Sequence, residues 1–169
     1  DLPCRLVSGA RLDGGGVRIL GVIFAGGAAR RIGSDKAVAP IDGKPMIEHV
    51  WQRARQSRLL NEIIIACDDE RIVKAAGKFG AKAVLTSKDH ACGTDRVAEV
   101  AADVSAEIIV NIQGDEPLIH QSMIDDLVTV LNNDPACVMA TAIKLIRTRE
   151  ELENPNVVKA VIDSNGNAL

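Results

Sequence analysis

The chain has 169 residues, of which 47% are hydrophobic, 25% charged and 2% aromatic, and its formal net charge is -3. This composition is typical of a globular domain, and a globule of this length buries roughly 70% of the surface of its unfolded chain. Proteins that stack single-stranded nucleic acid need several exposed rings, and an acidic chain has no overall basic field. We therefore expect no nucleic-acid partner.

Membrane association and disulfide bonding are not expected either. Apolar runs such as 63–65 and 108–110 are far shorter than the roughly 20 residues that span a bilayer. Residues 1–17 contain no apolar stretch like that of a secretory signal. The cysteines are far apart and form no C-x-x-C pair, so we expect reduced thiols in a cytoplasmic protein; they are Cys4, Cys67, Cys92 and Cys137.

The order of apolar segments predicts an α/β fold. Residues 1–17 lack apolar periodicity and are expected to form a flexible leader, followed by one domain over 18–169. Short apolar runs alternate there with amphipathic stretches around 46–54, 72–79 and 123–131, whose apolar residues are expected in the core. The predicted strands are 19–24, 62–67, 83–85, 108–113, 138–144 and 157–162. We expect a Rossmann-like, mostly parallel sheet with helices on both faces.

A glycine-containing loop follows the first predicted strand. It contains Ala25, Gly26 and Gly27, and then Arg31 and Lys36. At the carboxyl end of a strand, such a turn can direct backbone N–H groups at a phosphate, and the two cations add positive charge. The loop matches neither a Walker loop nor a dinucleotide fingerprint, and by itself it could equally be a plain surface turn.

A second segment places a carboxylate after the strand 108–113. Asp115 follows Gln113 and Gly114, and Glu116 precedes Pro117. Magnesium binds through one or two carboxylates together with substrate phosphates and water. We therefore predict that Asp115 holds Mg²⁺, whereas a capped turn is the alternative for this segment in isolation.

A third segment, 90–96, opens a predicted helix. Taken by itself, Thr94 would be its N-cap and Asp95 would complement the helix dipole. The three histidines are His49, His90 and His120. None shows a partner in the sequence, so we interpret them as surface or helix-end residues. No base that could activate Cys67 or Cys92 is evident.

In combination, these segments resemble a known family. Segments 25–36 and 42–47 resemble the start of nucleotidyltransferases that make activated sugars. Together with 113–117, segment 90–96 resembles the Ser-Gly-Thr-Asp/Glu-Arg motif of the 3-deoxy-manno-octulosonate (Kdo) cytidylyltransferase family, the CMP-Kdo synthetases. Segments 154–159 and 162–169 are similar to that family's Asn-Pro-Asn-x-Val-Lys strand and Asp-x-x-Gly-x-Ala-Leu turn. The resemblance extends over about 18–169 and implies a fold of the nucleotide-diphospho-sugar transferase type.

The resemblance implies a reaction and a set of site residues. The family transfers CMP from CTP to the anomeric hydroxyl of Kdo, releases pyrophosphate and serves lipopolysaccharide biosynthesis. It implies catalytic roles for Arg31, Lys36 and Asp115, with Mg²⁺ on Asp115. The implied nucleotide-binding residues are Ala25, Gly26, Gly27, Arg31, Lys36, Thr94, Arg96 and Gln113.

Two departures from the family pattern leave alternatives open. The first loop has Phe24, Gly26 and one extra residue between Arg31 and Lys36, which resembles the Leu-Ala-Gly-Gly loop of molybdenum-cofactor nucleotidyltransferases. The family also continues past the alanine-leucine turn with a sugar-binding lobe, the main dimer surface and a second metal-binding aspartate. We therefore expect an incomplete chain, and a homodimer for a complete one. The alternatives are a nucleotidyltransferase with another acceptor, such as molybdopterin, and a non-catalytic nucleotide-binding remnant.

Overall fold

The computed structural model describes residues 18–26 and 36–169. The predicted leader, together with Gly27 and Arg31 of the first loop, lies outside the described residues. The chain divides into one compact unit that extends to Met139 and a second, Ala140–Leu169, where the sequence predicts a single domain. Each unit is described by itself.

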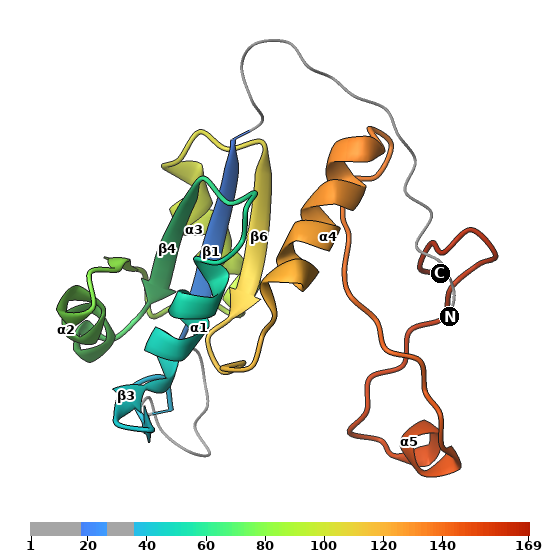
Figure 1. The fold of residues 1–169 in the computed structure, drawn as a ribbon, viewed down its shortest axis with the longest axis horizontal. Helices are drawn as coiled ribbons and strands as arrows, with labels where there is room; N and C mark the ends of the chain where they lie inside the picture. The colour runs from blue at the N-terminus through green and yellow to red at the C-terminus, as the bar shows by residue number, and fades with distance from the viewer. Residues whose placement is uncertain (1–17, 27–35) are drawn as a thin grey trace. The chain divides into compact units, whose positions relative to one another are not determined.

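The first unit contains a four-stranded parallel sheet (Figure 1). Its strands are β1 (Ile19–Ala25), β4 (Glu62–Cys67), β5 (Lys82–Leu85) and β6 (Ile108–Gln113), in the spatial order β5-β4-β1-β6. All four match the predicted strands to within one residue. Along the chain, β4 pairs with one side of β1, and β5 then pairs with the outer side of β4. The next strand, β6, pairs instead with the other side of β1. The strand order therefore reverses between β1 and β6, and open α/β sheets bind ligands beyond the carboxyl ends of the strands at such a point.

Helices cover both faces of this sheet, as predicted. One face packs against α1 (Met46–Ala54), α2 (Glu70–Lys78) and α4 (Gln121–Asn133), and the other packs against α3 (Gly93–Ala102). Figure 1 shows α1 in front of the strands and α3 behind them. The predicted core residues Ile47, Val50 and Ile124 are buried, whereas Met123 is 42% exposed. Met123 was wrongly expected in the core, because the apolar residues around it extend over a wider arc of α4 than the sheet covers.

A short hairpin leads into α1. It consists of β2 (Pro40–Ile41) and β3 (Lys44–Pro45), which pair antiparallel. Both turn residues have positive φ, 48° at Asp42 and 77° at Gly43. Asp-Gly is a favoured pair for such a two-residue turn, so the local sequence accounts for this geometry.

Two predicted strands are absent from the described structure. Segments 138–144 and 157–162 form no strand, and Val138 is 94% exposed. The second unit, Ala140–Leu169, contains the short helix α5 (Arg149–Glu153) and an isolated bridge between Ile162 and Ala168. The predictions at 138–144 and 157–162 were wrong because β-forming residues make a strand only where a neighbouring strand accepts their hydrogen bonds.

Three cysteines are described, Cys67, Cys92 and Cys137, and all three are free thiols, as predicted. Among the described residues, no helix combines the length and the hydropathy needed to cross a bilayer.

Candidate functional site

The carboxyl ends of β1 and β6 meet at Phe24. The backbone N–H of Gly114 donates to the carbonyl oxygen of Phe24 at 2.8 Å, which extends the pairing of the two strands by one residue. A Cβ on Gly114 would lie 2.5 Å from that oxygen and 3.1 Å from Cδ1 of Ile47. Only glycine permits this close approach. It therefore fixes the start of the loop that carries Asp115 beside the end of β1.

Lys36 and Asp115 form an ion pair at this edge of the sheet. The distance between Lys36 Nζ and Asp115 Oδ2 is 2.6 Å, and the two side chains are 45% and 49% exposed. The fold thus brings together two of the three predicted catalytic residues, which are 79 positions apart in the sequence. An exposed ammonium group can bind a phosphate group, and an exposed carboxylate next to it can bind the divalent cation of that phosphate.

Asp115 offers a half-exposed carboxylate as a donor for a metal ion at this edge. Among the described residues, no group of three or more histidine, cysteine, aspartate or glutamate side chains gathers at one place. Such a site does not retain a cation by protein ligands alone. It fits magnesium, which binds through one or two carboxylates and completes its shell with substrate phosphates and water.

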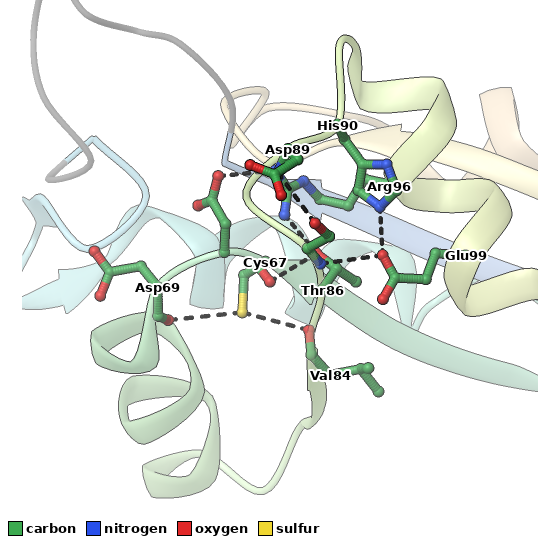
Figure 2. Close-up of polar contacts among 10 residues, drawn as sticks. Cys67, Asp69, Val84, Thr86, Asp89, His90, Arg96 and Glu99 are labelled. Carbon is green, nitrogen blue, oxygen red and sulfur yellow. Dashed lines mark hydrogen bonds and ion pairs between the residues drawn. The ribbon is translucent and has the colours of Figure 1, made fainter.

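Arg96 lies inside the protein rather than on the wall of an open site. Its side chain is 2% exposed. One guanidinium nitrogen donates to the hydroxyl of Thr86, and another donates to Oδ2 of Asp68 at 2.8 Å. Thr86 in turn donates to the carbonyl oxygen of Cys67 at 2.8 Å (Figure 2). Within the described part of the chain, Arg96 Nε has no hydrogen-bond partner.

The other predicted nucleotide-binding residues occupy different environments. The side chain of Ala25 is buried in the core, so only its backbone can face a ligand. Gly26 follows at the sheet edge with φ of 150°. Thr94 and Gln113 are exposed. Thr94 lies within the first turn of α3, and the N-cap is Cys92, so the N-cap prediction for Thr94 was wrong by two residues.

Sequence reasoning missed two residues that organise this edge. Asp68 directly follows β4 and pairs with Arg96. The ring of Phe24 packs against the start of α3, since a Cβ on Gly93 would lie 2.8 Å from it. The position of Asp68 after a predicted strand was an available signal, since the ends of parallel strands share one edge. No local pattern reveals that the Phe24 ring meets Gly93.

The histidines have structural partners, in agreement with their interpretation as surface or helix-end residues. The ring of His49 lies 2.8 Å from the carbonyl oxygen of Ile41. His120 is the N-cap of α4, where its Nδ1 accepts from the backbone N–H of Ser122 at 3.3 Å. His90 pairs with the carboxylate of Glu99. That contact, followed by the backbone N–H of Ser87, lowers the pKa of Glu99.

Cys67 is not placed to act as a nucleophile. Its side chain is buried, and its Sγ contacts the carbonyl oxygens of Asp69 and Val84 at 3.7 and 3.6 Å (Figure 2). Burial raises the pKa of the thiol. Since the thiolate is the reactive form, this environment disfavours nucleophilic chemistry at Cys67.

A hollow of about 340 Å³ lies at the opposite, amino end of the sheet. Asn61 and Glu62, at the start of β4, line it together with Lys82, the first residue of β5, and with Trp51 and Arg55. The hollow therefore does not coincide with the Lys36–Asp115 edge.

Comparison with known proteins is consistent with this geometry. Residues 23–169 match the model of the cytidylyltransferase family. A 3-deoxy-manno-octulosonate cytidylyltransferase of Geobacter sulfurreducens is 51% identical over 134 residues, which cover 79% of this chain and 54% of the relative. One from Geotalea daltonii is 46% identical over 153 residues, which cover 90% of this chain and 60% of the relative.

A solved structure is also similar. CMP:2-keto-3-deoxy-manno-octonic acid synthetase complexed with CTP has 37% sequence identity and a TM-score of 0.79, and the match covers 90% of this chain and 62% of that one. The chain thus spans between 54% and 62% of the length of these three proteins. Since the family model covers most of the sequence and the fold agrees, the chain belongs to the cytidylyltransferase family.

Proposed function

We propose that this chain forms the nucleotide-binding part of a 3-deoxy-manno-octulosonate cytidylyltransferase, which transfers CMP from CTP to the anomeric hydroxyl of Kdo and releases pyrophosphate. The observation that carries the proposal is the Lys36–Asp115 pair at the point where the strand order reverses. The names of the similar proteins supply the nucleotide and the acceptor.

The chemistry needs alignment of two substrates and neutralisation of charge on the phosphates. Lys36 is placed to donate to phosphate oxygens, which compete for it with the Asp115 carboxylate. With Lys36 bound to a triphosphate, Asp115 would be free to hold Mg²⁺. The cation would supply positive charge to the α-phosphate and to the pyrophosphate, on which negative charge develops as it leaves.

The residues around this pair would bind the rest of the nucleotide. Gly26 begins the loop at the end of β1 and can present backbone groups to a phosphate, as can Gly27 by resemblance. By the same resemblance, Arg31 would add positive charge for the β- and γ-phosphates. Thr94 and Gln113 are exposed and accessible to a ligand. We propose CTP and Kdo as substrates of the whole protein, a homodimer as its assembly and the cytoplasm as its location.

Asp115→Asn in the whole protein tests the proposal, with magnesium-dependent release of pyrophosphate from CTP plus Kdo as the measurement. We expect the rate to fall by about a hundredfold or more, since a group that organises transition-state charge is lost. The thermal midpoint should stay unchanged because Asp115 is half exposed. Asp126→Asn, at an exposed position on α4, is the matched control and should keep the wild-type rate.

Two results would contradict the proposal. One is the absence of pyrophosphate release by the whole wild-type protein, of which this chain is a part, with these substrates. The other is an Asp115→Asn variant as active as the Asp126→Asn control. Calorimetric titration with CTP and GTP separates the proposal from the molybdopterin alternative, since a clear preference for GTP would overturn the assignment of CTP.

A further inference from the structure

The ion pair between Asp68 and Arg96 connects three elements at the carboxyl edge of the sheet. Asp68 follows β4, Arg96 lies in the first turns of α3, and Thr86, which also binds Arg96, follows β5. Thr86 is itself buried, and both its hydroxyl and its backbone N–H donate to the carbonyl oxygen of Cys67, at 2.8 and 2.7 Å. The position of the Arg96 guanidinium is therefore set by Asp68 and by Thr86, and Thr86 is itself hydrogen-bonded to the backbone of Cys67.

The carboxylate of Asp68 lies directly against Gly26. A Cβ on Gly26 would be 2.6 Å from Asp68 Oδ1 and 3.1 Å from Oδ2. The same Oδ2 accepts the hydrogen bond from Arg96. Since Ala25 pairs with Cys67 in the sheet, Gly26 and Asp68 are neighbouring residues that leave adjacent strands. Arg96 thus holds a carboxylate against the first residue of the loop that leaves β1.

Arg96 also lies near the last residues of β1 on its other side. Its guanidinium carbon lies 6.0 Å from the centre of the Phe24 ring, at the outer limit of a cation–π contact. The ring contacts Gly93 at the start of α3. The side chain of Phe24 and the carboxylate of Asp68 therefore confine Arg96 between β1 and β4, with little surface left for a ligand.

We propose that Asp68 and Arg96 are positioning residues, which fix Gly26 and the exit of β1 for nucleotide binding without contacting the nucleotide through the guanidinium. This inference rests on the proposed function for its nucleotide, whereas its structural part stands on the contacts of Gly26. The resemblance to the family assigns Arg96 to the nucleotide pocket. Its buried contacts with Thr86 and Asp68 indicate instead that it orients residues of that site without contacting the nucleotide.

The first measurement does not depend on any ligand. In protein labelled with ¹⁵N-glycine, the amide resonance of Gly26 should shift in Asp68→Asn, which keeps the shape of the side chain and removes its charge. It should shift as well in Arg96→Lys, because one ammonium group cannot replace a fork that reaches two acceptors. Resonances of Gly77 and Gly80, where an added Cβ would meet no atom within 4 Å, should stay in place.

The second measurement is the affinity for CTP by calorimetry in the presence of Mg²⁺. Both variants should bind CTP about tenfold more weakly, the size of an ordinary coupling between two sites. Glu62→Gln is the matched control, since it breaks an ion pair of similar length, 2.7 Å to Lys82, at the other end of the same strand. It should leave both the Gly26 resonance and the affinity for CTP unchanged.

The outcomes separate the two claims. An unchanged Gly26 resonance in Asp68→Asn would overturn the positioning role, and so would a shifted resonance with an affinity equal to that of Glu62→Gln. If Arg96→Lys does not fold, Asp68→Asn decides alone. Wild-type protein that does not bind CTP would contradict the proposed function, and the Gly26 resonance would still decide whether the pair fixes the exit of β1.

Discussion

The two ends of the parallel sheet are built differently. At the carboxyl end, Gly114 approaches the Phe24 carbonyl closely and the Arg96–Asp68 pair is largely buried. At the amino end, Glu62 pairs with Arg18 and Lys82, whose side chains are more than half exposed, next to a hollow of about 340 Å³. This hollow thus lies away from the end where backbone, cation and carboxylate converge.

The difference follows from how parallel strands end. At the carboxyl end of the sheet, each strand leaves as a loop that leads into a helix or a turn, so loops from separate parts of the chain lie side by side. Polar side chains on those loops can therefore form hydrogen bonds and ion pairs with each other and with backbone groups. Exposed ion pairs compete with hydration by water, so each stabilises the folded state by at most about 1 kcal/mol. The burial of the Arg96–Asp68 pair and the close approach at Gly114 distinguish the carboxyl end, where the candidate site lies.

The largest expected effect on stability is that of Gly114→Ala. The new methyl group would meet the Phe24 carbonyl oxygen at 2.5 Å, and forcing such a contact costs about 1–3 kcal/mol. Urea denaturation should show this loss. Gly77→Ala is the control, because its site in α2 is open and alanine there should raise stability by about 1 kcal/mol. Equal stability of Gly114→Ala and wild type would contradict the close approach.

Lys36→Gln should weaken CTP binding and leave folding unchanged. The variant loses a charged donor to the phosphates, so the dissociation constant should rise about tenfold to a hundredfold, as for hydrogen bonds to charged groups. Calorimetry measures this change. Lys82→Gln removes a similarly exposed lysine at the amino end of the sheet and should bind CTP like wild type. If Lys36→Gln and Lys82→Gln bound CTP with the same affinity, the proposed difference in function between the carboxyl and amino ends of the sheet would be contradicted.

Glu99→Ala should loosen the segment that precedes α3. The carboxylate of Glu99 accepts from the backbone N–H of Ser87 at 3.1 Å and pairs with His90. Without this acceptor, the Ser87 amide should exchange its hydrogen faster, while exchange at Gly114 should not change. Hydrogen exchange followed by NMR measures both amides. Unchanged exchange at Ser87 would show that Glu99 does not hold this segment.

The smallest effect is expected for Glu62→Gln, which should cost less than about 1 kcal/mol at pH 7, as for exposed ion pairs. The hydrogen bond from Lys82 is the main cause that lowers the pKa of Glu62 below its ordinary value of 4.5. A lowered carboxyl pKa stabilises the folded state above the ordinary value, and this contribution disappears as the pH falls through the lowered value. Thermal midpoints of the variant and wild type should therefore converge on acidification. A difference that persists in acid would contradict this origin.

The sequence was sufficient to predict the sheet where the strands are buried. The segments at 19–24 and 62–67 are apolar runs, and burial on both faces leaves such runs little choice of structure. Segment 108–113 lies at the edge of the sheet, where buried Val110 and Ile112 alternate with exposed residues, a pattern typical of a half-buried strand. The sequence was insufficient at 138–144, where the apolar and β-branched residues are similar in kind. The outcome there depends on a neighbouring strand, which no local pattern encodes.

Local sequence determined the Asp42-Gly43 turn, the amphipathic helices and the candidate catalytic groups Lys36 and Asp115, because each depends on the chemistry of neighbouring residues. Only the tertiary structure decided that Lys36 and Asp115 pair, that Phe24 meets Gly93 and that Arg96 is buried against Asp68. These contacts join residues from different strands and helices. They form because the parallel sheet brings the carboxyl ends of β1, β4 and β6 to one edge, which is a property of the fold and not of any one segment.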